Sequence, residues 1–342
     1  TVTAADEFAG LAEVDLMCAD IRDLDLDHDW DIDAPQAIAL AIETEAAALQ
    51  LDDRISNSEG ATVETNRGTR TYGNSHGFIG SVSRTSHSVT CVVLAESDGV
   101  MQRDYFYTAA RDPEDLDPAV SVGRRAATRV LDRLGARKLT TRRAPVLLVP
   151  ELARGFFGHA IGAISGGAQY RRSSFLLDAR GNKVFPDFVD IQERPHLLKG
   201  MASKPYDAEG VATYDRDIVL GGVLQDYALS SYSARRLGMK TTANAGGTQN
   251  LIVPGGGKDK AALIAEMGTG LLVEELIGQG VNGVTGDYSR GAVGHWIENG
   301  EIQHPVHEIT IAGNLLDLYQ HIVAIGDDQD IRGGIRCGSL LL

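Results

Sequence analysis

The residues with the clearest chemical potential surround His159, in the segment "RGFFGH" at 154–159. A hydrolytic zinc site needs about three protein ligands, an open coordination position and a carboxylate that takes a proton from the bound water. None of the positions three to five residues before or after His159 holds a side chain that can bind zinc. Arg154 keeps its positive charge in proteins and repels a dication. Taken alone, His159 is therefore predicted to be a structural histidine.

Three shorter motifs match catalytic or nucleotide-binding patterns but lack the context that the chemistry requires. "GNSHG" at 73–77 resembles a nucleophile elbow, yet the pattern after it predicts a strand rather than a helix. "GQGVNG" at 278–283 resembles a dinucleotide fingerprint, yet poor helix formers follow it. "PGGGKDK" at 254–260 imitates a phosphate loop, yet Asp259 stands where Ser or Thr is required. We predict a turn between strands for the first and no nucleotide site for the others.

The composition is that of an acidic globular chain, with 32 basic and 47 acidic residues among 342 and a formal net charge of -15. Such a surface repels phosphate backbones and anionic lipid, so we expect no direct nucleic-acid binding. No apolar run reaches the roughly 20 residues that a membrane helix needs. Cys18, Cys91 and Cys337 show no CxxC spacing, which favours a reducing compartment, the cytoplasm.

The first predicted domain, residues 1–142, combines helical and strand patterns. Asp33 is expected to cap a helix that has Pro35 in its first turn. The apolar stripe of this helix consists of Ile38, Ala41, Ile42, Ala46 and Leu49. Alternation with period two at 62–108 predicts antiparallel strands with turns at 66–68 and 97–99. Together with an amphipathic helix predicted at 117–135, this indicates an α+β layer with helices on one sheet face.

The second predicted domain, residues 143–342, is rich in glycine and in short segments. The apolar run "APVLLVP" at 144–150 is typical of a buried strand. Helices are expected near 151–165 and 258–267, and the remainder predicts a large, mainly antiparallel β domain. The predicted fold class is therefore α+β, with the domain boundary near residue 142.

Long strings of this sequence resemble the TldD/PmbA family, once described as modulators of DNA gyrase. They include "RGFFGHAIGAISGGAQYRRSSFLLD" at 154–178, "LSSYSARRLGMKTTANAGGTQN" at 229–250 and "MGTGLLVEELIGQGVNGVTGDYSRGAVGHWIENGEIQHPV" at 267–306. The likeness spans nearly the whole chain and matches the PmbA branch, also called TldE. The chain opens with Thr1 rather than Met, and the family's usual N-terminal portion and last strand are expected to lie outside it.

The resemblance also implies where a metal site is missing. In that family the TldD subunit carries an H-E-x-x-x-H helix and a cysteine as zinc ligands. Laid over this chain, the first His falls on Arg154, the Glu on Gly155, the second His on His159 and the cysteine on Cys337. One ligand and the general base are absent, so the resemblance implies a degenerate site without catalytic residues, and zinc on a TldD-like partner.

The function implied by the resemblance is that of one subunit in a heterodimeric metalloprotease that acts on unfolded peptides. This subunit is expected to complete the partner's peptide-binding chamber. The segment Gly286, Asp287, Tyr288, Ser289 and Arg290 is the candidate channel lining, with Tyr288 packing on peptide and Arg290 meeting a terminal carboxylate. The alternative for this segment is a hairpin turn with Arg290 in a surface ion pair.

Two other functions stay open at this point. The first is that the chain is itself a metallopeptidase that uses His159, Cys337 and a distant third ligand. The second is an interaction protein linked to gyrase that acts without proteolysis. Because subunits that normally pair often present the same apolar surface to their own copies, a homodimer of the isolated chain is a further expectation.

Overall fold

The computed structural model describes residues 5–342, in which runs of consecutive strands are separated by helices. The helices are η1 (Val14–Leu16), α1 (Ala34–Leu49), η2 (Pro113–Asp115), α2 (Ala119–Asp132), α3 (Pro150–Ala163), α4 (Gly166–Tyr170), α5 (Ser231–Leu237), α6 (Lys260–Met267) and α7 (Leu315–Gln320). The strands are β1 (Asn57–Gly73), β2 (Ile79–Ser97), β3 (Val100–Ala110), β4 (Val146–Leu148), β5 (Ile191–Glu193), β6 (Arg216–Leu220), β7 (Val223–Leu224), β8 (Leu251–Ile252), β9 (Gly270–Ile277), β10 (Asp287–Glu298), β11 (Glu301–Asn314), β12 (Ala324–Ile325), β13 (Ile335–Arg336) and β14 (Leu340–Leu341).

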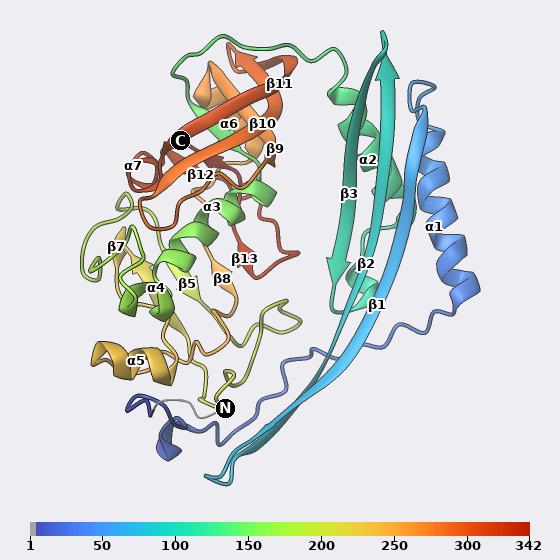
Figure 1. Cartoon of the computed structure of the whole chain (residues 1–342). Coiled ribbons are helices and arrows are strands. Elements are labelled where there is room, and N and C mark those ends of the chain that lie inside the picture. The colour runs from blue at the N-terminus through green and yellow to red at the C-terminus, as the bar shows by residue number, and fades with distance from the viewer. Residues whose placement is uncertain (1–4) are drawn as a thin grey trace.

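These strands form three sheets that divide the molecule into a long slab and a larger body (Figure 1). The slab is the antiparallel sheet β1-β2-β3, with α1 and α2 packed on one of its faces (Figure 1). The body contains a six-stranded sheet in the order β11-β10-β9-β4-β14-β12 and a five-stranded sheet in the order β13-β8-β5-β6-β7. Most pairs are antiparallel, the exceptions being β4 with β9 and β13 with β8. The predicted α+β class, with a large and mainly antiparallel second half, is confirmed.

The slab is held together by the odd-numbered positions of β2. Val89, Cys91 and Val93 are buried against the two helices. The predicted cap by Asp33 at the start of α1 is confirmed, and it is part of a capping box, because Asp33 and Gln36 bond each other's backbone N–H groups. Alternate residues of a strand point to opposite faces, so the even-numbered positions of β2 face the body.

The inward face of α1 differs from the one that its apolar stripe predicts. Ile38 and Ile42 are 59% and 60% exposed, whereas Thr44 and Ala48 are fully buried. A Cβ atom on Gly123 of α2 would lie 2.0 Å from the Thr44 carbonyl oxygen, so the two helices approach too closely for large side chains between them. Close helix packing therefore selects the small residues of α1, and Ile38, Ile42 and Leu49 of the apolar stripe stay exposed.

The hairpin turns of the slab were predicted correctly at one place and wrongly at another. The turn at 97–99 is confirmed, with Asp98 and Gly99 both in the left-handed region. No turn exists at 66–68, because β1 continues through these residues and Arg67 pairs with Thr85. The long ladder with β2 overrides the local turn preference, and the chain reverses at 74–78 instead.

The first strand of the body places α3 at the junction with the slab. β4 is almost completely buried between β9 and β14, which confirms the predicted buried strand at 144–150. Pro150 then begins α3 directly, and α6 lies close to the second predicted helix. The predicted boundary near residue 142 falls in the segment between α2 and β4 and stays a prediction.

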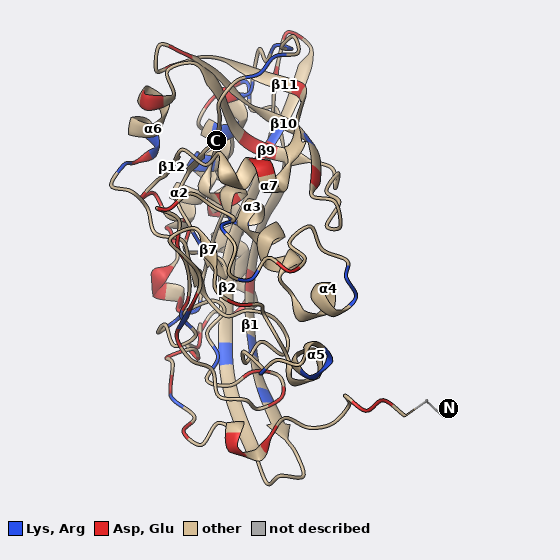
Figure 2. Ribbon diagram, turned by 90° about the vertical axis from the view of Figure 1, so that its left-hand side faces the viewer, with Lys and Arg blue, Asp and Glu red and all other residues tan. Residues whose placement is uncertain are grey.

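Charged positions are spread over both the slab and the body rather than separated by sign (Figure 2). Between residues 5 and 342, no helix has the length and apolarity needed to cross a membrane.

Candidate functional site

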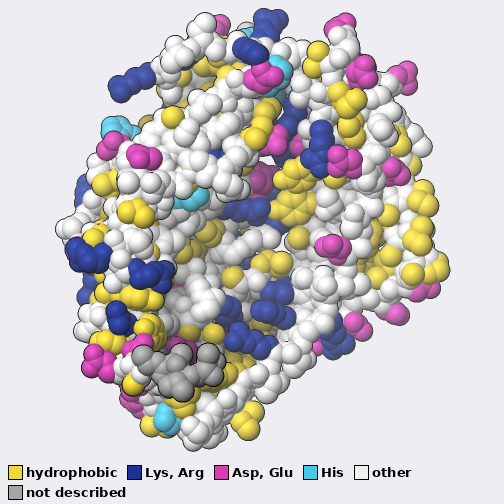
Figure 3. All heavy atoms as spheres, in the orientation of Figure 1, with side chains coloured by type: hydrophobic (Ala, Val, Ile, Leu, Met, Phe, Trp, Pro, Cys, Tyr) yellow, Lys and Arg dark blue, Asp and Glu magenta, His cyan; other side chains and the backbone are white. Residues whose placement is uncertain are grey.

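A cavity of about 970 Å³ lies where the slab meets the body. Its walls come from the end of β3, from α2, from the first turn of α3 and from the segment 328–336. Figure 3 shows a hollow between slab and body in which charged side chains of both signs gather. Glu151, Asp330 and Arg332 line one end of this cavity, and Arg154 of the degenerate metal site lies behind them, paired with Asp330.

Arg154 occupies the first position of the degenerate metal site and is held by an ion pair. Its Nη1 donates to Oδ2 of the buried Asp330 at 3.1 Å, and its Nη2 donates to the Tyr107 hydroxyl at 3.0 Å. Burial opposes the charge of Arg154, but Tyr107 and Asp330 outweigh it and raise the pKa of the guanidinium. A permanently charged donor with no lone pair cannot act as a zinc ligand.

Arg332 extends this ion pair into a cluster that joins three elements. It donates to Asp330 Oδ1 at 2.8 Å, to Glu151 Oε1 at 2.9 Å and to the Tyr107 carbonyl oxygen at 2.7 Å. Its guanidinium also lies 4.4 Å from the centre of the Tyr107 ring. The cluster therefore ties α3 and the 330–332 segment to β3, across the end of the cavity.

Cys337 is fully buried and lies behind the cluster. Its sulfur is 3.9 Å from the Pro150 carbonyl oxygen. Burial, with a smaller contribution from Asp330, raises the pKa of the Cys337 thiol to about 12. Because zinc binds the thiolate, this raised pKa makes the deprotonation that accompanies metal binding more costly than for an ordinary cysteine.

The His159 side chain takes no part in the cluster around Arg154 and packs against β10 instead. The His159 ring packs edge-on against Tyr288 at 6.1 Å between centroids, and burial together with Arg290 lowers the pKa of this histidine. Gly155, at the position of the general base, offers no side chain, so the four positions do not fit a zinc ion. Across residues 5–342, no three His, Cys, Asp or Glu side chains are grouped closely enough to hold a metal.

The second predicted site, residues 286–290, belongs to a central strand. Gly286 precedes β10, which pairs with β11 from Asp287 onward and with β9 from Gly291 onward. The hairpin-turn alternative is therefore wrong. Asp287 and Ser289 are exposed, but Tyr288 is only 4% exposed because it packs against Phe156 and His159 in the core. This burial does not fit the expectation that its ring packs on a peptide.

Arg290 departs from the surface ion pair of the hairpin-turn alternative, while its contact with a terminal carboxylate stays a prediction. Its guanidinium donates to the carbonyl oxygens of Leu276 and Ile277 at 3.5 and 3.4 Å. It forms no ion pair with any residue that the structure describes, and it does not line the cavity. Its guanidinium thus lies over the end of β9, beside the point where the pairing of β10 with β9 begins at Gly291.

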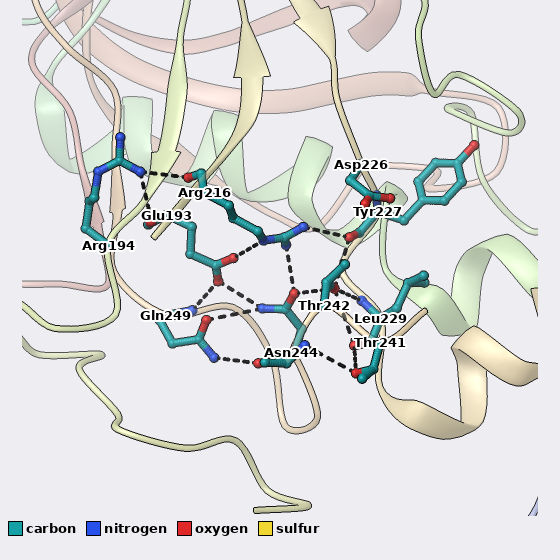
Figure 4. Close-up of polar contacts among 11 residues, drawn as sticks. Glu193, Arg194, Arg216, Asp226, Tyr227, Leu229, Thr241, Thr242, Asn244 and Gln249 are labelled. Atoms are coloured by element: carbon teal, nitrogen blue, oxygen red, sulfur yellow. Dashed lines mark hydrogen bonds and ion pairs between the residues drawn. The ribbon is translucent and has the colours of Figure 1, made fainter. Parts of the chain in front are cut away.

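A second buried polar cluster, which sequence reasoning missed, lies beside the five-stranded sheet (Figure 4). The carboxylate of Glu193 is 1% exposed and accepts from Arg216 at 2.7 Å, from Asn244 at 2.9 Å and from the Gln249 backbone N–H at 2.7 Å. Arg216 in turn donates to Asn244 Oδ1 at 2.7 Å. We call this set the Glu193 network. The polar run "TTANAGGTQN" at 241–250 was the available signal, because so many uncharged polar residues beside glycines are typical of an ordered loop.

No pattern in the sequence predicted the cavity. Its cationic wall includes Arg111, which follows β3, and Arg336, which lies on β13. These residues are more than two hundred positions apart along the chain, and neither belongs to a recognisable motif.

Comparison with known proteins connects both halves of the chain to one family. Residues 27–134 match the PmbA/TldA metallopeptidase central domain, and residues 141–342 match the PmbA/TldA metallopeptidase C-terminal domain.

Individual relatives agree with this match. The chain is 51% identical to Metalloprotease PmbA of Escherichia coli O157:H7, over 99% of this chain and 76% of that protein. It is 49% identical to the Metalloprotease PmbA homolog of Haemophilus influenzae, with the same shares covered. Among solved structures, a putative modulator of DNA gyrase from Bacteroides thetaiotaomicron superposes with a TM-score of 0.94 at 29% identity, over 99% of this chain and 78% of the other.

Proposed function

We propose, from the premise that this chain belongs to the PmbA/TldD metallopeptidase family and to its PmbA/TldE branch, that it is a non-catalytic, peptide-binding subunit. Its partner is a TldD-like chain that carries zinc, and its substrate is an unfolded peptide. The three cysteines are free and buried, which supports a reducing compartment, the cytoplasm. In this proposal, Arg154, Gly155, His159 and Cys337 hold no metal and perform no chemistry.

The observation that carries the proposal is the ion pair of Arg154 with Asp330. No rotation of the Arg154 side chain restores the ligand position, because a guanidinium has no lone pair for zinc, and its ion pair with the buried Asp330 holds it in place. The burial that raises the pKa of the Cys337 thiol and the packing of the His159 ring against Tyr288 weaken the other two positions. These features argue against the alternative that the chain is a metallopeptidase by itself.

The cavity supports the peptide-binding part of the proposal. Its volume of about 970 Å³ lies near the upper end of the range for small-ligand sites, which suits an extended peptide segment. One wall is the end of β3, an edge strand, and a peptide can add to such an edge through backbone hydrogen bonds with little sequence choice.

Part of that edge is already occupied by arginine side chains. The carbonyl oxygens of Arg103 and Tyr107 accept from Arg133 and Arg332, respectively. Residues 108–110, which line the cavity, are the part of β3 that we assign to backbone pairing with a peptide.

Co-purification with a TldD-type chain followed by peptide cleavage tests this function. Zinc is measured in each separated chain, and cleavage of a disordered peptide is measured for each chain alone and for the mixture. We expect zinc only in the TldD-type chain and cleavage that increases when this chain is added. Stoichiometric zinc and cleavage by this chain alone would favour the metallopeptidase alternative.

The gyrase-linked alternative predicts a different outcome of the same assay. The name of the Bacteroides structure as a putative modulator of DNA gyrase motivates it. It predicts no gain in cleavage on mixing, and an effect on DNA supercoiling by gyrase without any protease. Size-exclusion chromatography of the isolated chain tests the proposed homodimer in the same preparation.

A further inference from the structure

Four cations between the slab and the body have no carboxylate partner. They are Arg70 on β1, Arg84 on β2, Arg111 after β3, and Lys204 in the facing loop of the body. Within residues 5–342 none of the four takes part in an ion pair. In a chain of net charge -15, where many basic side chains pair with acids, four unpaired cations together require an explanation. We call these four residues the basic track.

The strand register places the two arginines of the hairpin side by side. Arg70 pairs with Val82, which is two residues from Arg84 on β2. Positions two apart on a strand share a face, so Arg70 and Arg84 are diagonal neighbours. Both lie on the face opposite to Val89 and Cys91, which pack against the helices. Their side chains therefore leave the slab toward the body.

Electrostatic repulsion links the members of the track to one another. Burial and then the charges of Arg84 and Arg70 lower the pKa of Lys204. Burial and then the charge of Arg84 lower the pKa of Arg111. Figure 3 shows dark blue side chains gathered in the lower part of the hollow between slab and body. The track is thus a continuous region of uncompensated positive charge.

The nearest acids are engaged elsewhere. Asp207 and Glu193 act on Lys204 only through their charge and from a distance. Asp207 accepts backbone N–H groups of Glu209, Val211 and Ala245, and Glu193 belongs to its own network. Neither carboxylate is available to neutralise the track.

Arg111 connects the track with the cavity and has an unused donor. Its side chain is 6% exposed and lines the cavity, and its two Nη atoms donate to the carbonyl oxygens of Thr85 and Met201. Its buried Nε has no hydrogen-bond partner. Arg336, on the opposite wall, likewise has a buried Nε without a partner and forms no ion pair within the described part of the chain. A buried donor without a partner destabilises a protein unless a ligand satisfies it.

We propose that the basic track and Arg336 form a binding site for carboxylates of an extended peptide, so that this subunit prefers peptides with spaced Asp or Glu side chains or a free C-terminus. This inference rests on the proposed function, which it deepens by naming the substrate class. Arginine is suited to the role because its planar donors match a carboxylate in pairs. The carboxylate recognition predicted for Arg290 is thereby assigned to other residues.

The surroundings of the track favour a peptide over a nucleic acid. The cavity wall also carries carboxylates, among them Asp115, Asp132 and Asp328. A phosphate backbone carries a charge at every nucleotide and would meet these acids, whereas a peptide can place carboxylates only where the cations lie.

Binding of a labelled peptide to the isolated chain tests the inference without any protease. The probe is a fluorescein-labelled extended peptide of Ser and Gly with several spaced glutamates, compared by anisotropy with an analogue that has glutamine at those places. We expect the glutamate peptide to bind at least about tenfold more tightly at low salt, because several charge-assisted hydrogen bonds are lost in the analogue. The preference should decrease as the salt concentration rises.

Variants locate the site. R84Q/K204Q is expected to weaken binding of the glutamate peptide about tenfold while leaving the glutamine peptide unaffected. R172Q removes an exposed charge outside the track and is the matched control, expected to change neither affinity. Circular dichroism of each variant verifies the fold.

Three outcomes would overturn the inference. They are equal binding of the two peptides, equal loss of affinity in R84Q/K204Q and R172Q, and tight binding of a single-stranded oligonucleotide with none of the peptide. The test is separable from that of the proposed function. A glutamate preference without any gain in cleavage on mixing would sink the proposed function alone, and a gain in cleavage without a glutamate preference would sink this inference alone.

Discussion

The Glu193 network and the basic track are both built from charged residues at the junction of segments distant in sequence, yet they differ in how the charge is satisfied. In the network, Glu193 and Arg216 are 1% and 9% exposed, and each is surrounded by polar partners from the same protein (Figure 4). In the track, Lys204 and Arg111 are desolvated and face further cations instead. A network whose charged groups are all satisfied stabilises a fold. Charged groups that lack a partner and lie beside a cavity can instead bind a ligand.

The cluster around Arg154 shares one property with each of these two regions. Its carboxylates, Asp330 and Glu151, are fully paired with arginines, as in the network. Glu151, Asp330 and Arg332 of this cluster nevertheless line the cavity, as Arg111 of the track does. In the position of a metal site, the chain therefore has a structural ion pair. The difference between charges that are paired within the protein and charges that have no partner leads to four predictions, from the largest expected effect to the smallest.

Glu193→Gln should cause the largest loss of stability. It leaves the buried guanidinium of Arg216 without its counter-ion, and breaking such a pair costs about 3–5 kcal/mol. Urea unfolding followed by fluorescence measures the change. Glu59→Gln is the control, because its pair with Arg103 is solvent-exposed and no measurable change is expected. Equal effects of the two variants would contradict the assignment of the network as fully satisfied.

The double variant R154H/G155E restores the local H-E-x-x-x-H pattern but should not gain zinc. His159 would still face Tyr288 and the Cys337 thiol would still be protonated. Since Arg154 is 31% exposed and Asp330 keeps Arg332, the loss of stability should be about 1–2 kcal/mol. Mass spectrometry of bound metal after dialysis measures the first expectation and urea unfolding the second. One zinc per chain would show that the geometry of the site is intact after all.

The pair of His295 and Glu274 should make stability depend on pH. His295 Nδ1 and Nε2 contact Glu274 Oε2 at 2.7 Å and the Asp132 carbonyl oxygen at 3.0 Å, so both nitrogens need a proton. Burial opposes the charge on both residues. The contacts of His295 with Glu274 and Asp132 nevertheless raise the pKa of the histidine, and those of Glu274 with His295 lower the pKa of the glutamate.

The sign of this dependence follows from the two directions. A raised histidine pKa contributes stability that is complete below about 6.5 and is lost as the pH rises through the folded value. A lowered glutamate pKa contributes stability that is complete above about 4.5 and is lost as the pH falls through the folded value. The free energy of unfolding, measured in urea from pH 4 to 9, should therefore include a contribution that decreases above about pH 6.5. H295Q should remove this contribution, while H76Q, which changes a histidine at an exposed turn, should not. A pH dependence above about 6.5 that persists in H295Q would refute the assignment of the contribution to His295.

R84Q/K204Q should have the smallest effect on stability and differ in sign from Glu193→Gln. Removing a desolvated cation and its like-charged neighbour relieves repulsion, so the urea midpoint should stay the same or rise slightly. A marked loss of stability would show that the basic track is a structural cluster like the Glu193 network.

Much of the local structure could be predicted from the sequence because it depends on near neighbours. Asp33 caps α1, the Asp98-Gly99 turn joins β2 to β3, and the apolar run at 144–150 forms a buried strand. Such features follow from backbone preference and hydrophobic period. The turn at 66–68 was wrongly predicted because these residues of β1 pair with residues 84–86 of β2. The long ladder between the two strands overrides the local turn preference.

The sequence by itself determined the family, the α+β class and the chemical fact that Arg154 cannot be a ligand, since these depend only on residue types and their order. Tertiary structure decided that Tyr288 is buried, that the Cys337 thiol keeps its proton, and that Ile38 of α1 faces outward. It also brought together the cations of the basic track. Desolvation and charge–charge distance are properties of the folded chain, because they arise between segments whose separation in space is independent of their separation in sequence.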